Sequence, residues 1–168
     1  MIATVMPLEE FNRLPHDEAR ARAAACLDVT RWVEAVVGGR PYADREDVLA
    51  VATEEASHLD DDELADALVR HPRIGERGQV GRHDLAQSAY EQAGVDRDDL
   101  DVAARLVEGN RAYEERFDRV FLIRAAGRDG EEILGELRRR LGNDDEDERA
   151  ETVEQLGEIA LLRLERVV

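Results

Sequence analysis

Apolar positions recur along this chain at the spacing of amphipathic helices, and short stretches containing proline, glycine or acidic residues interrupt them. The pattern predicts helix after helix, ending with one that follows the acidic stretch 144–148 and reaches residue 168. The other predicted helices cover residues 8–14, 17–26, 30–37, 44–57, 63–70, 84–94, 98–116 and 129–141. The apolar run 120–123 is the only credible extended segment. We therefore expect an all-α fold, a compact bundle of about eight or nine helices.

Turn and capping residues support several of these boundaries. Pro72 disfavours a helical conformation in His71, so the helix before it is expected to end there. Three glycines within 74–82 predict a loop. Asp129 with Glu132 three residues later forms a capping pattern at the start of the helix that follows.

The charge of the chain narrows the range of partners. Its 168 residues include 40 acidic and 23 positive side chains, all 23 of them arginine, for a net charge of −17. At this length one domain, residues 1–168, is the default. A surface this acidic would repel nucleic acid and anionic lipid, so we expect no nucleic-acid partner and no membrane partner. Without lysine the chain cannot use a Schiff base or a P-loop lysine.

Metal binding and export are also not expected. The single cysteine, Cys26, excludes an intramolecular disulfide and a cysteine-based zinc cluster, and we expect it to be buried. No two histidines have the spacing of a helical zinc site. The N-terminal stretch lacks the features of a signal peptide, and no stretch approaches the roughly 20 apolar residues that span a bilayer. These features predict a cytoplasmic protein.

One arginine of the last predicted helix lies on its apolar face. At 100° per residue, Arg163 falls in the centre of this face, seven residues after Leu156 and four before Val167. An inward guanidinium is costly unless an anion or a full set of hydrogen bonds receives it. The geometry leaves two alternatives open, an internal salt bridge and a residue that binds an anionic ligand.

Two further positions are candidates for chemistry. His71 ends a helix beside a loop, where it could transfer protons near neutral pH or simply cap the helix carbonyls. Ser88, Glu91 and Gln92 emerge on one face of the predicted helix 84–94. Such a face could hold a small polar ligand, or it could be an ordinary solvated stripe.

A series of different short motifs is spread along nearly the whole chain. They are Phe11-Asn-Arg-Leu-Pro15, Cys26 with Arg31-Trp32, Arg40-Pro41-Tyr42, His71-Pro72-Arg73-Ile74-Gly75-Glu76, Ser88-Ala89-Tyr90-Glu91-Gln92, Asn110 with Tyr113 and Arg116-Phe117, Phe121-Leu122-Ile123, Arg140-Leu-Gly-Asn143, and Glu158-Ile with Arg163-Leu164. In this order and spacing they resemble the OHCU decarboxylases, which act on 2-oxo-4-hydroxy-4-carboxy-5-ureidoimidazoline (OHCU). The resemblance implies an all-helical, cofactor-free and commonly dimeric enzyme that releases CO2 to give (S)-allantoin in urate breakdown.

The resemblance also implies roles for single residues. His71 and Glu91 correspond to catalytic positions, with His71 mediating proton transfer to the substrate. Arg163 corresponds to the arginine that holds the substrate anion. The remaining implied substrate contacts are Pro72, Ser88, Ala89, Tyr90, Gln92, Phe121, Leu122, Ile123, Arg124 and Ala125.

The chain departs from the family pattern at three places. Arg73 stands where an acidic or neutral residue is usual, Asp118-Arg119-Val120 replaces a frequent Gly-Phe-Pro, and the segment after Gln92 is short. Two other functions remain alternatives, a catalytically silent helical module that binds a small ligand, and a decarboxylase or lyase for a related ureido acid. In every case the net charge opposes an anionic substrate, so binding must rest on local arginine, histidine or backbone N–H groups.

Overall fold

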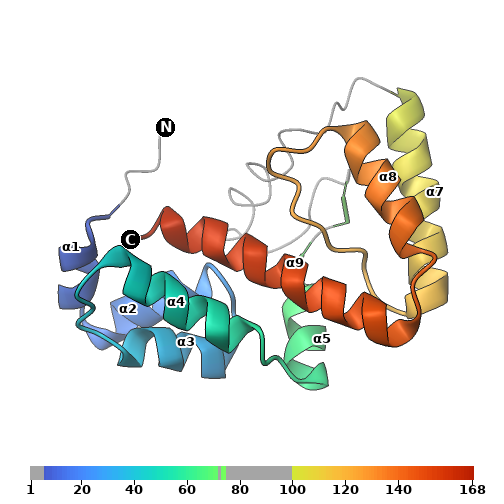
Figure 1. Ribbon diagram of the computed structural model, residues 1–168. Coiled ribbons are helices and arrows are strands. Elements are labelled where there is room, and N and C mark those ends of the chain that lie inside the picture. Colours follow the sequence, from blue (N-terminus) through green and yellow to red (C-terminus); the bar gives the residue numbers. More distant parts are fainter. Residues whose placement is uncertain (1–5, 72, 75–99) are drawn as a thin grey trace. The chain divides into compact units, whose positions relative to one another are not determined.

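The computed structural model describes residues 6–71, 73–74 and 100–168, and within them the chain forms eight α-helices (Figure 1). They are α1 (Leu8–Arg13), α2 (His16–Ala24), α3 (Thr30–Gly38), α4 (Arg45–Ala56), α5 (Asp61–Val69), α7 (Leu100–Phe117), α8 (Gly130–Arg140) and α9 (Asp145–Glu165). These described residues contain no strand. The prediction of an all-α fold is confirmed. The predicted helix 84–94 and most of the glycine loop 74–82 lie outside the described residues.

The helices belong to two compact units. The first comprises Met1–Ala67 and Gly157–Val168, and the second comprises Leu68–Leu156. Helices α5 and α9 each contribute residues to both units. The expectation of one domain over residues 1–168 stays a prediction. No helix of the described ranges is both long enough and apolar enough to cross a bilayer.

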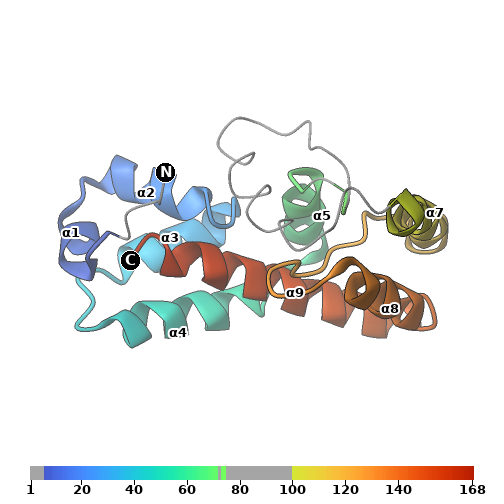
Figure 2. The same ribbon diagram turned by 90° about the horizontal axis from the view of Figure 1, so that it is seen from above.

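The first unit is built on α3, which packs against α2 and α4 (Figures 1 and 2). Trp32 of α3 is fully buried, and its indole N–H donates to the Ala52 carbonyl of α4 over 3.0 Å. A buried indole needs such a partner, because its N–H has lost the hydrogen bond that it would make to water. Phe11 and Val36 are equally inaccessible, and Cys26 is buried as predicted.

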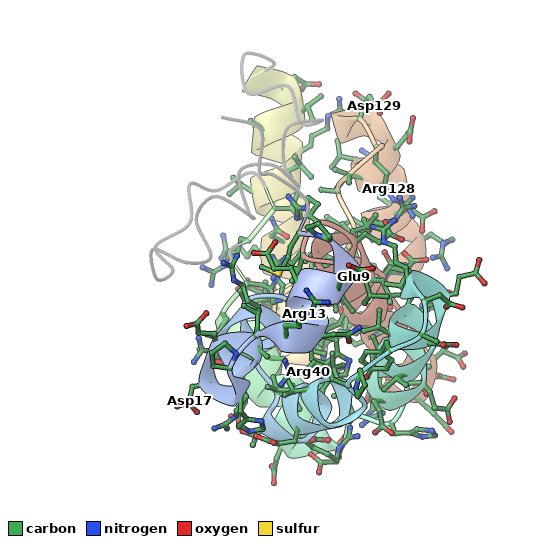
Figure 3. All side chains as sticks on the ribbon, turned by 90° about the vertical axis from the view of Figure 1, so that its left-hand side faces the viewer. Glu9, Arg13, Asp17, Arg40, Arg128 and Asp129 are labelled. Atoms are coloured by element: carbon green, nitrogen blue, oxygen red, sulfur yellow. The ribbon has the colours of Figure 1, made fainter. Side chains whose placement is uncertain are left out.

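Arg40 ties the link between α3 and α4 to α1 (Figure 3). Its Nη1 donates to the carbonyls of Phe11 and Leu14 over 2.9 and 2.8 Å, in the last turn of α1 and at the residue just beyond it. Asn12 adds a reciprocal pair of hydrogen bonds with the backbone of Tyr42, each 2.9 Å long. The Arg40–Pro41 peptide bond between these anchors is cis.

The second unit contains α7 and α8 side by side (Figures 1 and 2). Their buried faces share one hydrophobic cluster with two non-helical segments. The cluster consists of Ile74, Val102, Leu106, Tyr113, Phe117, Phe121, Ile123, Ala125, Ile133, Leu134 and Leu137. Side chains from both segments that the sequence marks as functional, 71–76 and 121–125, therefore pack into the same core.

Side-chain caps set the starts of several helices. Asp129, at the start of α8 (Figure 3), accepts a hydrogen bond from the Glu132 N–H over 2.8 Å, which confirms the predicted cap. Helix α5 begins at Asp61, two residues before the predicted start. The reason is a reciprocal capping box, in which Asp60 accepts from the Glu63 N–H and the Glu63 carboxylate accepts from the Asp60 N–H.

Two parts of the prediction are corrected. The run 120–123 is neither helix nor strand, and buried side chains rather than a sheet hold it in place. The last helix ends at Glu165 instead of reaching residue 168. Because the backbone turns there, Val168 is buried and Val167 is only partly so, the reverse of the helical projection.

Asp118 directly follows α7 and takes a left-handed conformation, with φ of 54°. Glycine adopts this conformation without steric cost, and the family pattern has glycine at this position. We expect Asp118→Gly to raise the free energy of unfolding by about 0.5–1 kcal/mol. Asp118→Ala should lower it by a similar amount, since alanine has a Cβ and no polar group to compensate. Urea denaturation of both variants tests this, and equal shifts of the same sign would contradict it.

Candidate functional site

His71 lies just beyond the end of α5 in the second unit and is half-buried. Its backbone N–H donates to the Leu68 carbonyl over 3.1 Å, so it closes the last turn of the helix. The predicted end of the helix before Pro72 is confirmed. The helix therefore holds the backbone of His71, while its half-buried side chain keeps part of its surface accessible, as a proton-transfer group requires.

Two contacts hold the chain directly after His71 against α7. The Arg73 guanidinium pairs with both carboxylate oxygens of Glu114, with Nη2 3.1 Å from Oε2. The Asn110 amide Nδ2 donates to the Ile74 carbonyl over 3.1 Å. The Ile74 side chain is itself buried in the core cluster. The segment carrying His71 is thus anchored at α5 on one side and at α7 on the other.

The second candidate segment, 121–125, is irregular but strongly held. Four of its five side chains are buried, and Arg124 is partly so. The Arg124 N–H donates to the Gln155 side chain over 3.0 Å, and the Arg124 carbonyl accepts from Arg128 Nε over 3.0 Å. Side chains thereby satisfy backbone groups that a helix or a sheet would otherwise pair.

A buried ion pair lies beneath this segment. Arg140 and Glu148 are 1% and 0% exposed, and Arg140 Nε donates to Glu148 Oε1 over 2.9 Å. The same guanidinium donates from Nη1 to the Leu122 carbonyl over 2.6 Å and from Nη2 to the Thr152 hydroxyl over 3.2 Å. Its carbon Cζ lies 4.7 Å from the centre of the Phe121 ring. Arg140 therefore joins α8 and α9 to the backbone of the 121–125 segment.

Glu148 is saturated with donors as well. The Tyr113 hydroxyl donates to its Oε1 over 2.6 Å, and the Asn143 amide donates to its Oε2 over 3.0 Å. A buried charge is tolerated only when such partners replace the lost water. Burial of the Tyr113 ring, with the bond to Glu148 as the next cause, raises the pKa of Tyr113 from 10.0 to about 12.

This raised pKa predicts alkaline destabilisation. The folded state holds the Tyr113 proton more tightly than the unfolded state, so the stabilisation is complete below pH 10 and is lost as pH rises through 12. The difference corresponds to about 2–3 kcal/mol. The chain contains no lysine, so no lysine titrates between pH 10 and pH 12. The stability advantage of the wild type over Tyr113→Phe should therefore shrink by this amount between pH 9 and pH 12 in urea titrations. An unchanged difference would contradict the assignment.

Arg163 is 4% exposed and belongs to the first unit, on the buried face of α9 between Ile159, Ala160 and Leu164. The predicted inward direction of this side chain is confirmed. Burial is what an internal salt bridge and a ligand-binding arginine would both require, so it does not by itself choose between the two alternatives.

Six of the predicted site residues lie outside the described residues. They are Pro72, Ser88, Ala89, Tyr90, Glu91 and Gln92. The structure places His71 and the 121–125 segment in one unit and Arg163 in the other. The described residues contain no group of His, Cys, Asp and Glu side chains arranged to hold a metal ion.

The burial of two polar residues that the sequence analysis does not single out as inward, Arg140 and Glu148, has a signal in the sequence. Arg140 follows Ile133 by seven residues and Leu137 by three, so it falls on the apolar face of α8 just as Arg163 does on α9. Glu148 precedes Thr152 by four residues and Leu156 by eight on the inward stripe of α9. A projection of each helix would have placed both charges in the core.

The sequence profile of the family described as OHCU decarboxylase matches residues 12–165. The chain belongs to the OHCU decarboxylase family. It is 32% identical over 169 residues to 2-oxo-4-hydroxy-4-carboxy-5-ureidoimidazoline decarboxylase from Amia calva, across 97% of this chain and 95% of the relative. The resemblance seen in the motifs is therefore confirmed at the level of the family.

A second relative is much longer. The uric acid degradation bifunctional protein of Bacillus sp. (strain TB-90) is 23% identical over 164 residues, which are 97% of this chain but 32% of the relative. The chain thus spans about a third of that protein.

Solved structures confirm the fold of the OHCU decarboxylase-family chain. A crystal structure of OHCU decarboxylase in the presence of (S)-allantoin matches with a TM-score of 0.68 at 19% identity, covering 84% of this chain and 92% of that one. A crystal structure of (S)-allantoin synthase matches with a TM-score of 0.69 at 15% identity, covering 96% of this chain and 54% of that one.

Proposed function

We propose that this chain decarboxylates OHCU to (S)-allantoin, with His71 as the residue that transfers the proton. The observation that carries the proposal is family membership across residues 12–165 together with an accessible histidine fixed at the end of α5. The core cluster that anchors His71 through Ile74 also anchors the 121–125 segment, whose backbone the family resemblance implies in substrate binding.

The chemistry needs few groups from the protein. The bond between the ring carbon and the carboxylate breaks, CO2 leaves, and the adjoining C=N group of the substrate takes up the electron pair. The hydroxyl proton passes to that nitrogen as the C–OH group becomes C=O, and one proton is added to a face of the neighbouring ureido-bearing carbon. The face that receives it sets the (S) configuration. In this account His71 delivers that proton, while Glu91 and Ser88 hold the hydroxyl and ureido groups. The electron sink belongs to the substrate, so the proposal includes no cofactor.

Arg163 is proposed to orient the substrate anion through a charge-assisted hydrogen bond. Arg163→Gln should raise KM for OHCU by roughly 10- to 100-fold, the equivalent of about 1.5–3 kcal/mol for a bond to a charged group. The control is Arg138→Gln, which makes the same change in net charge on an exposed position of α8. Steady-state kinetics distinguish a substrate-binding arginine from one in a purely internal salt bridge. In the second case Arg163→Gln would lower the stability of the protein and leave KM near the wild-type value.

The proposed activity is tested with freshly generated OHCU and circular dichroism. We expect the protein to accelerate OHCU loss over buffer alone and to produce allantoin with the optical sign of the (S) enantiomer. A silent binding module would give the buffer rate and no optical activity. A lyase for a related ureido acid would show itself in competition, where the other acid would be consumed first. Either result would overturn the proposal.

Two finer expectations belong to the same proposal. We propose that the protein acts as a homodimer, as the family resemblance implies, and that it works in the cytoplasm. Light scattering at micromolar concentration should then give twice the chain mass of 18.9 kDa. A mass equal to one chain would contradict the dimer.

A further inference from the structure

The chain beyond His71 is held by a side chain that the motif resemblance leaves without a role. Asn110 lies in the middle of α7 and is 4% exposed, with its amide donating to the Ile74 carbonyl over 3.1 Å. This carbonyl lies 36 residues earlier in the chain and outside any described helix. Within the described ranges the other amide atom, Oδ1, is buried and accepts no hydrogen bond.

Such a residue is costly in a helix that otherwise packs through apolar side chains. Burying an amide with one of its polar atoms unsatisfied carries a desolvation cost, which a leucine at the same place would avoid. The neighbouring side chains on this face, Leu106 and Tyr113, are buried in the core cluster. The one bond that Asn110 makes fixes the backbone three residues after His71.

The second contact between this segment and α7 is weaker in kind. Arg73 and Glu114 are 45% and 28% exposed, and ion pairs that reach solvent contribute little to stability and are screened by salt. Asn110 and Glu114 are four residues apart, so both contacts come from one face of α7. The buried hydrogen bond of Asn110 holds the segment irrespective of ionic strength.

We infer that Asn110 is a positioning residue for His71. By fixing the Ile74 carbonyl on α7, while α5 fixes the His71 N–H, it holds the intervening backbone at both ends and so fixes where the imidazole lies. A displacement of about 1 Å at a reacting group can cost roughly 10²-fold in rate. The inference rests on the proposed function of His71 as the proton-transfer residue.

The test compares two asparagines that bind backbone. Asn110→Ala should lower kcat on OHCU about tenfold or more and change KM less than about twofold. Asn12→Ala removes the two bonds to the Tyr42 backbone in the first unit, and should lower the melting temperature while leaving kcat unchanged. If Asn110→Ala does not fold, Asn110→Leu preserves the side-chain volume and still removes the donor. Equal kcat in wild type and the Asn110 variant would overturn the inference.

Two readouts separate this inference from the proposed function. In a His71→Ala background, Asn110→Ala should cause no further loss of kcat, and an equal loss in both backgrounds would overturn the positioning role. If the protein does not turn over OHCU, the proposed function fails, and the positioning role is decided by NMR of the imidazoles. The His71 signals, identified by their loss in His71→Ala, should shift in the Asn110 variant and stay in place in Asn12→Ala. Unmoved His71 signals would overturn it.

Discussion

Glu148→Leu should lower the free energy of unfolding by about 3–5 kcal/mol, the usual cost of leaving one partner of a buried ion pair alone. Glu148 is fully buried and receives hydrogen bonds from Arg140, Tyr113 and Asn143. Its loss would leave the Arg140 charge in the core with only the Leu122 carbonyl and the Thr152 hydroxyl. Urea denaturation followed by far-UV circular dichroism measures the change.

The matched control is Glu115→Leu on α7. Glu115 also pairs with an arginine, but the two side chains are 69% and 73% exposed, so we expect a change within about 0.5 kcal/mol. The double variant Arg140→Met with Glu148→Leu should be less destabilised than the sum of its single variants, because it removes both charges. Additive losses would show that the pair does not act as one buried unit.

His71→Ala should lower the rate of OHCU decarboxylation roughly 10²-fold or more, the contribution typical of a positioned general acid or base. The side chain is half-buried at the end of α5, and the bond from its backbone N–H to Leu68 does not depend on the side chain. We therefore expect the circular dichroism spectrum of the variant to match that of the wild type while kcat falls.

His58→Ala is the control for this variant. His58 lies just beyond the end of α4 with its side chain 63% exposed, beside Glu54 at 2.9 Å. Its removal should leave kcat within twofold of the wild type. Full activity in His71→Ala would show that another group transfers the proton.

Much of the fold could be predicted because each helix has its own signal. The caps at Asp129 and the break before Pro72 are local, since they depend on hydrogen bonds and sterics within a few residues. The inward direction of Arg163 followed from helical periodicity in the same way. By contrast, α9 was expected to reach residue 168, and its end at Glu165 carries no glycine or proline in the sequence.

The parts that could not be predicted depend on contacts between distant residues. The run 120–123 has the composition of a strand, but its Leu122 carbonyl accepts a hydrogen bond from Arg140 of α8, and no strand is found within the described residues. The pairing of Arg140 with Glu148, and that of Asn110 with Ile74, joins side chains to groups that no local pattern specifies. Asn110 and Arg140 belong to the motifs that carry the family resemblance, but only the structure shows which groups they bind.

The most direct measurement of the central claim uses OHCU labelled with 13C in its carboxyl group. The appearance of 13CO2 and of optically active allantoin is followed in the same sample, with wild type and His71→Ala in parallel. The account predicts that both products form together, faster than in buffer, with the sign of (S)-allantoin and with the His71 variant slower by roughly 10²-fold. Release of 13CO2 at the buffer rate, or racemic product, would contradict it.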